Sequence, residues 1–267
     1  MLPTFKKLAR AVLPGRLATQ AYRYYRMPIY GRVRFGSLKR ITPIQRGFSS
    51  GRGTYIDRYY IDKFLSKHAE DVRGRVLDLC EDGYTRQFGG SKVTHSDVLD
   101  VRPGHPGATI IADLTKGEEI PSDAFDCVIL TQTLNFIYDT RAAIGTVHRI
   151  LKPGGVVLVS VPGICQVSME EVAYCGDFWR FTHLSLRRLF EEFFPSRCIT
   201  VETGGNVFAA TAFLYGISVE ELPAKKLEYN DPDYQLSVLL RAVKPLEEIS
   251  SGDNAPRSPA CESKHAN

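Results

Sequence analysis

Acidic side chains follow several of the short apolar segments in the first half of the chain. Glu81 and Asp82 come shortly after Asp78, and Asp97 lies 19 residues beyond Asp78. A carboxylate at the end of a second strand, about 20 residues after the first loop, can accept hydrogen bonds from both hydroxyls of a ribose. Four such carboxylates would repel a pyrophosphate, and the G-x-G-x-x-G spacing that lets backbone approach one is missing. The pattern therefore favours a ligand with a ribose and a positive centre over a dinucleotide.

The apolar segments that would position these carboxylates are predicted to be strands of a parallel sheet. They are nearly continuous apolar runs, as expected when helices cover both faces of a sheet, and helices are predicted at 55–72 and 140–151. Repeated strand–connection–strand order is typical of an α/β fold, whose ligands bind beyond the carboxyl ends of the strands. The predicted strands are 75–79, 92–97, 108–113, 126–130, 156–161, 198–202 and 233–243, with further helices at 182–194 and 207–215.

Charge is distributed unevenly along the chain. Residues 1–50 hold eleven Lys or Arg and no Asp or Glu, which leaves 23 basic and 30 acidic side chains, a net charge of −7, for the rest. A basic arm joined to an acidic body predicts an anionic partner for the arm. We expect a basic N-terminal arm over 1–47, one folded domain over 48–245 and a disordered tail over 246–267.

The partner of the arm stays open among a membrane surface, a protein such as a glycosyltransferase, and a nucleic acid. Leu2, Phe5 and Leu8 recur at helical spacing between basic residues, which is typical of a helix that lies on a membrane. Residues 22–26 combine tyrosine and arginine, a mixture that stacks on bases. A helical extension that packs on the body is an equally good interpretation, and the acidic body weighs against a nucleic acid.

Several classes of protein are excluded by what the sequence lacks. It contains no run of eighteen apolar residues, and no apolar segment of a secretory signal follows the basic N-terminus. Its six cysteines form no C-x-x-C pair, which argues against a zinc ribbon and a redox dithiol, and no metal site is predicted. We therefore expect a cytoplasmic protein with reduced cysteines, peripheral at a membrane if the arm binds one.

Six stretches, taken in their order, resemble the class I S-adenosylmethionine-dependent methyltransferases. The resemblance extends over about 48–245 and is closest to the branch found with bacterial glycan and secondary-metabolite pathways. It implies a Rossmann-like α/β fold: a mainly parallel seven-stranded sheet with helices on both faces and an antiparallel last strand. It also implies S-adenosylmethionine as cofactor and O-methylation of a sugar, a glycan or another small polar metabolite. The stretches are 75–89, Ser96-Asp97, Ala112-Asp113-Leu114, FDCVILTQTL at 125–134, HRILKPGGVVLVSVPG at 148–163 and FWRFT at 178–182.

The same resemblance implies which residues bind the cofactor. Residues 78–83 would surround the methionine part, Asp97 would hold the ribose, and residues 112–114 would flank the adenine. Residues 131–132 would form the floor near the sulfonium, and residues 52–59 would close over it. The implied cofactor-binding residues are Asp78, Leu79, Cys80, Glu81, Gly83, Asp97, Val98, Ala112, Asp113, Leu114, Thr131, Gln132, Arg58 and Tyr59.

The first loop departs from the family pattern, because Cys80, Asp82 and Tyr84 stand where the family carries glycine. The same fold without a cofactor, serving as an interaction module, is therefore the alternative prediction. Methyl transfer to oxygen can need a general base, and we predict it after the fifth strand, with His183 as first candidate and Asp177 as second. The end of the fourth strand lacks the Asn/Asp-Pro-Pro-aromatic segment of enzymes that methylate nucleobase amino groups, so a nucleic-acid acceptor is not expected.

Overall fold

The computed structural model describes residues 36–46 and 52–246. The chain divides into two compact units, Met1–Pro43 and Ile44–Asn267. The described part of the first unit contains one 3-10 turn, Gly36–Leu38. Most of the predicted basic arm and all of the predicted tail except Leu246 lie outside the described residues. Among the residues that the structure describes, no helix is long and apolar enough to cross a membrane.

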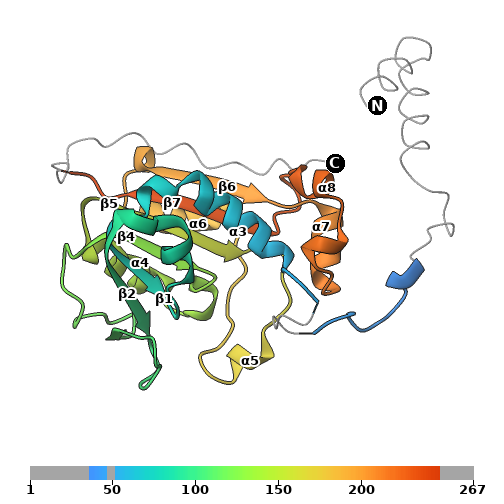
Figure 1. Ribbon diagram of the computed structural model, residues 1–267, viewed down its shortest axis with the longest axis horizontal. Helices are drawn as coiled ribbons and strands as arrows, with labels where there is room; N and C mark the ends of the chain where they lie inside the picture. The colour runs from blue at the N-terminus through green and yellow to red at the C-terminus, as the bar shows by residue number, and fades with distance from the viewer. Residues whose placement is uncertain (1–35, 47–51, 247–267) are drawn as a thin grey trace, which may run out of the picture. The chain divides into compact units, whose positions relative to one another are not determined.

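The second unit is built on a seven-stranded sheet with the strand order β3-β2-β1-β4-β5-β7-β6 (Figure 1). Strand β7 is antiparallel to both β5 and β6, and the other neighbouring strands are parallel. The predicted α/β fold with an antiparallel last strand is thereby confirmed. The strands are β1 Gly74–Leu79, β2 Val93–Asp100, β3 Ile110–Ile111, β4 Phe125–Thr131, β5 Leu151–Pro162, β6 Ile199–Gly204 and β7 Ser237–Val243.

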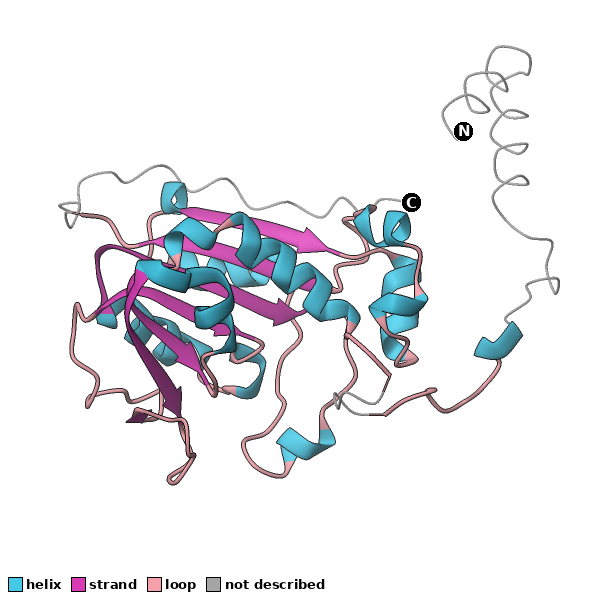
Figure 2. Ribbon diagram, viewed as in Figure 1, coloured by secondary structure: helices cyan, strands magenta, loops and turns pink. Residues whose placement is uncertain are grey.

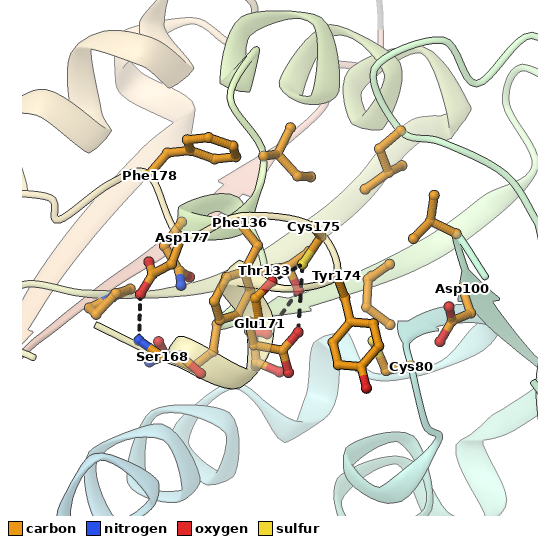
Figure 3. Close-up of a pocket in the computed structure, with 18 of the residues that line it drawn as sticks. Cys80, Asp100, Thr133, Phe136, Ser168, Glu171, Tyr174, Cys175, Asp177 and Phe178 are labelled. Atoms are coloured by element: carbon orange, nitrogen blue, oxygen red, sulfur yellow. Dashed lines mark hydrogen bonds between the residues drawn. The ribbon is translucent and has the colours of Figure 1, made fainter. Parts of the chain in front are cut away.

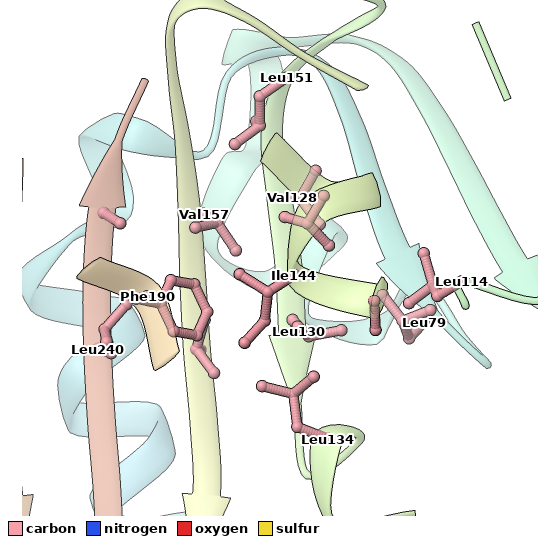
Figure 4. Packing of buried hydrophobic residues seen from close by; sticks show 14 of the residues in the cluster. Leu79, Leu114, Val128, Leu130, Leu134, Ile144, Leu151, Val157, Phe190 and Leu240 are labelled. Carbon is pink, nitrogen blue, oxygen red and sulfur yellow. The ribbon is translucent and has the colours of Figure 1, made fainter. Parts of the chain in front are cut away.

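Two amphipathic helices cover one face of this sheet. They are α4 (Thr140–Ile150) and α6 (His183–Glu191). Their apolar side chains, among them Ile144 and Phe190, are fully buried in one cluster with strand residues such as Leu130 (Figure 4). Burial of each such side chain is worth about 1.5–3 kcal/mol, so this layer is a main source of stability.

The opposite face is covered by α3 (Ile56–Lys67), as Figure 2 shows. Its residues Ile61 and Leu65 are fully buried against strand residues such as Ile129, whose side chain points away from the α4–α6 layer. Successive strand residues therefore face opposite layers, which explains why the strand segments read as continuous apolar runs. The remaining helices are α5 Met169–Val172, α7 Val207–Leu214 and α8 Ala224–Glu228.

Two predicted element ends differ from the structure in ways that affect the site. Strand β2 does not end at Asp97 but continues to Asp100, because buried Leu99 pairs with β1 and extends the ladder. The predicted helix 55–72 ends at Lys67, after which the chain forms a short 3-10 turn. The acidic residue at the carboxyl end of β2 is therefore Asp100.

The connection between β1 and β2 is unusually short. A single π-helical turn, Thr85–Gly89, and a 3-10 turn, Gly90–Lys92, replace a full crossover helix. Gly89 packs against Val72 and Val93 so closely that a β-carbon there would come within 2.3 Å of the Val93 side chain. The connection is thus closely packed on the sheet and leaves the carboxyl end of β1 open.

Candidate functional site

A cavity of about 770 Å³ opens beyond the carboxyl ends of the strands at the centre of the sheet. It lies where β1 is flanked by β2 on one side and β4 on the other, which is the point where strand order reverses. Ligands of open α/β sheets bind at this point. Its volume falls in the usual range for small-molecule sites, so the cavity is large enough for a ligand of cofactor size.

The first loop turns sharply at Cys80, which has a φ of +67°. Its backbone N–H donates to the carbonyl oxygen of Leu99 at 2.9 Å and so ties the loop to β2. Positive φ is the region that glycine enters without steric cost. The chain therefore makes a left-handed turn at a cysteine, which itself lines the cavity.

Asp78, at the end of β1, is a buried carboxylate that lines the cavity. Its oxygens accept hydrogen bonds from the backbone N–H of Leu79 at 3.0 Å and from Thr85 at 3.2 Å. Burial raises the pKa of Asp78 to about 7 and outweighs these hydrogen bonds. Among the described residues it forms no ion pair, so it remains available to a cationic ligand.

A second buried carboxylate, Asp57 of α3, lines the same cavity. Burial likewise raises the pKa of Asp57. The neighbouring Arg58 donates through Nη1 to the Tyr84 hydroxyl at 2.7 Å, and both of these residues line the cavity. Asp57 and Asp78 therefore both contribute carboxyl groups to the lining, as Arg58 contributes a guanidinium group.

The structure does not place Asp97 in the cavity lining. Its carboxylate forms an ion pair with Arg75 at 2.7 Å and accepts a hydrogen bond from the Thr109 hydroxyl at 3.0 Å. Burial opposes ionisation, but these hydrogen bonds outweigh it and lower the pKa of Asp97. Asp97 thus joins β1 to β2, and the β2 carboxylate that lines the cavity is Asp100.

Asp100 lines the cavity from the end of β2, as Figure 3 shows. Arg102 donates to its carboxylate through Nε at 3.0 Å, through Nη2 at 2.9 Å and through its backbone N–H at 2.7 Å. The hydrogen bonds from Arg102 lower the pKa of Asp100 despite burial. The signal that identifies Asp100 in the sequence is the apolar pair Val98-Leu99, which continues the strand past Asp97.

The cavity gathers most, but not all, of the predicted site residues. Tyr59 and Gly83 do not line it, and neither does Val98, which is buried beside Asp97. Arg52, in the segment predicted to close over the cofactor, instead pairs with Glu221. The predicted residues that line the cavity are Asp78, Leu79, Cys80, Glu81, Ala112, Asp113, Leu114, Thr131, Gln132, Arg58 and Asp177.

The two predicted general bases have different surroundings. Asp177 lines the cavity, but its buried carboxylate is held by Arg180 at 2.6 and 2.8 Å and by the Ser168 backbone N–H at 2.9 Å (Figure 3). These bonds outweigh burial and lower its pKa. His183 begins α6 outside the lining, where its ring and its backbone N–H both contact Gln235, at 2.7 and 2.9 Å.

One wall of the cavity is formed by residues 164–180 after β5, and two of its side chains, Glu171 and Cys175, were not selected from the sequence. Glu171 and Tyr174 line the cavity, as does the thiol-bearing Cys175 (Figure 3). Asn135 and Tyr138, which follow β4, face the same wall. An available signal was the mixture of acidic and aromatic residues directly after the Pro-Gly end of β5.

The chain matches a family of methyltransferase domains over residues 54–196 and belongs to that family. S-adenosylmethionine is the cofactor that this assignment supports. No curated protein matches the chain significantly.

The chain is also similar over part of its length to solved structures, among them these three. The YcgJ protein of Bacillus is 13% identical, with a TM-score of 0.45 over 70% of this chain and 99% of its own. Phosphoethanolamine N-methyltransferase 2 of Haemonchus contortus is 17% identical, with a TM-score of 0.48 over 70% of this chain and 52% of its own. An S-adenosylmethionine-dependent methyltransferase of Archaeoglobus fulgidus is 13% identical, with a TM-score of 0.44 over 70% of this chain and 90% of its own.

Proposed function

We propose that this protein is an S-adenosylmethionine-dependent methyltransferase that methylates a hydroxyl of a sugar, a glycan or another small polar acceptor. The observation that carries this proposal is the acid-lined cavity at the carboxyl ends of β1, β2 and β4 in a chain of the methyltransferase-domain family. The turn at Cys80 leaves that cavity open although the family's glycines are absent.

The lining suggests how the parts of the cofactor would be held. Asp100 ends β2 and would accept the ribose hydroxyls in place of Asp97. Asp113 and its two neighbours would lie along the adenine, since they enter the lining beside β3. Asp78 would face the positive charge of the methionine part of the cofactor, and Arg58 would face the carboxylate of that methionine part. Each charged group of the methionine part would thereby face a side chain of opposite charge.

Methyl transfer to a hydroxyl depends mainly on alignment. The cofactor supplies a methyl group on a positively charged sulfur, which leaves as a neutral thioether. The residues of this chain would bring an acceptor oxygen in line with that carbon and keep water away, which contributes strongly to rate. The proton of the acceptor hydroxyl must also depart, and Asp177 is the predicted base that lines the cavity.

Titration calorimetry with S-adenosylhomocysteine tests the proposal. We expect binding in the micromolar range and a loss of about tenfold to a hundredfold for Asp100→Ala, the equivalent of about 1–3 kcal/mol. The matched control is Asp231→Ala, which removes a carboxylate that does not line the cavity. No binding by folded protein would contradict the proposal and support the interaction-module alternative.

A further inference from the structure

Three aromatic rings lie together at the edge of the cavity, on the side of residues 164–180. The Tyr138 and Trp179 rings are stacked, with centroids 5.7 Å apart and an interplanar angle of 27°. Phe178 meets Tyr138 edge-on at 5.4 Å. Tyr138 and Phe178 line the cavity and are 70% and 47% exposed, so part of each side chain is accessible to a ligand, whereas Trp179 is 38% exposed and does not line the cavity.

The backbone after β4 holds the Trp179 indole and the main chain that carries Phe178. The indole N–H of Trp179 donates to the carbonyl oxygens of Ile137 and Tyr138 at 3.1 and 3.2 Å. The backbone N–H groups of Phe178 and Trp179 both donate to the carbonyl oxygen of Asn135, at 2.8 and 3.2 Å. A flat surface of this kind binds a ring face at little cost in side-chain entropy.

Two amide oxygens beside this surface have no hydrogen-bond partner among the described residues. They are Oδ1 of Asn135 and Oε1 of Gln166, both in cavity-lining residues. The Asn135 side chain is buried and also hydrogen-bonds Asp177. A buried acceptor without a donor costs about 1–3 kcal/mol. A ligand that carries at least two hydroxyl groups would supply the missing donors.

The charge of the lining selects against anionic ligands. Eight carboxyl groups line the cavity, against three guanidinium groups and no lysine or histidine. Arg102 and Arg180 are already bound by Asp100 and Asp177, and Arg58 donates to Tyr84. A phosphate group would therefore meet mostly like charge.

We propose that Tyr138, stacked on Trp179, provides the aromatic surface of an acceptor subsite for an uncharged carbohydrate, whose hydroxyls bind the amide oxygens of Asn135 and Gln166. This inference rests on the proposed function and narrows its acceptor to sugars without phosphate. Aromatic stacking recognises the apolar face of a sugar ring, and several hydroxyl donors match several free acceptors.

The test uses the fact that Trp179 is the single tryptophan of the chain. Its fluorescence is titrated in protein saturated with S-adenosylhomocysteine, using methyl α-glucoside, methyl α-mannoside and methyl α-galactoside, each beside the corresponding hexose 6-phosphate. We expect a saturable change with at least one neutral glycoside and none with the phosphates. Binding of S-adenosylhomocysteine is measured separately by calorimetry.

Variants connect this signal to the proposed surface. Tyr138→Ala should weaken glycoside binding about tenfold, whereas Tyr138→Phe keeps the ring and should stay within about twofold. Gln166→Ala should weaken glycoside binding about fivefold, because one hydrogen bond to the glycoside is lost. The matched controls Tyr229→Ala and Gln87→Ala, at exposed positions outside the lining, should bind like the unaltered protein.

The outcomes separate this inference from the proposed function. If S-adenosylhomocysteine binds but no glycoside changes the fluorescence, the carbohydrate subsite is wrong while the methyltransferase proposal stands. The carbohydrate subsite would also be overturned if the hexose phosphates bound as tightly as the neutral glycosides, or if Tyr138→Ala bound the glycosides as tightly as the unaltered protein. If S-adenosylhomocysteine itself does not bind, the proposed function fails and the subsite fails with it.

Discussion

Arg75 and Asp97 form an ion pair of 2.7 Å between β1 and β2, and Asp97 does not line the cavity. Three residues further along β2, Asp100 occupies the cavity lining. Two carboxylates of one strand thus have separate tasks. One joins neighbouring strands, and the other faces the candidate site.

Substitution of the two carboxylates should separate stability from binding. Asp97→Ala removes a partly exposed ion pair and the hydrogen bond from Thr109, and should lower the free energy of unfolding by about 1–2 kcal/mol. Its affinity for S-adenosylhomocysteine should stay within about twofold of the unaltered protein. Urea denaturation and calorimetry measure the two effects. A loss of affinity as large as that of Asp100→Ala would show that Asp97 belongs to the site.

The raised pKa of Asp78 predicts a pH-dependent stability. An aspartate in the unfolded chain has a pKa near 3.9, and burial raises that of Asp78 to about 7 in the folded protein. Between these values the folded state holds a proton that the unfolded state has lost. The contribution of Asp78 to stability should therefore decrease as pH rises from about 4 to about 7.

Asp78→Asn tests this dependence. The variant should be more stable than the unaltered protein by about 1–2 kcal/mol at pH 8, where the buried carboxylate is ionised, and the difference should shrink at pH 5. Urea denaturation at the two pH values provides the measurement. If the difference in stability between Asp78→Asn and the unaltered protein were the same at pH 5 and pH 8, Asp78 would not titrate in this range.

The same titration should affect binding of a cationic ligand. Ionised Asp78 attracts the positively charged methionine part of S-adenosylmethionine, so affinity should rise about tenfold between pH 6 and pH 8. Asp78→Asn should bind more weakly and show a flat profile across the same range. Calorimetry at several pH values checks this, and a profile that is unchanged by the substitution would assign the dependence to another group.

The turn at Cys80 makes a prediction about glycine. Because its φ is +67°, Cys80→Gly should relieve backbone strain and raise stability by up to about 1 kcal/mol relative to Cys80→Ala, which keeps that strain. Thermal denaturation compares the two variants. An alanine variant more stable than the glycine variant would show that the turn is not strained.

The sequence was sufficient to predict the parallel sheet, because strand segments buried on both faces have an unmistakable apolar composition. It predicted the β1 side of the cavity for the same reason, since Asp78 follows such a segment directly. The antiparallel last strand was implied only by the resemblance to the methyltransferases. The role of Asp97 was assigned from spacing, and spacing cannot reveal that Arg75 pairs with it across the strands. Asn135 and Tyr138 were missed because their place in the lining depends on contacts with residues 164–180, far away in the sequence.

The strand order of the sheet also sets the order in which the protein can be completed during synthesis. Strand β5 pairs with β4, which precedes it, and with β7, which ends at Val243. In a nascent chain, the strands around the cavity, β1 to β4, are therefore synthesised long before β7, the second neighbour of β5. Until β7 has left the ribosome, the far edge of β5 remains an unpaired strand edge, a template for association with other chains.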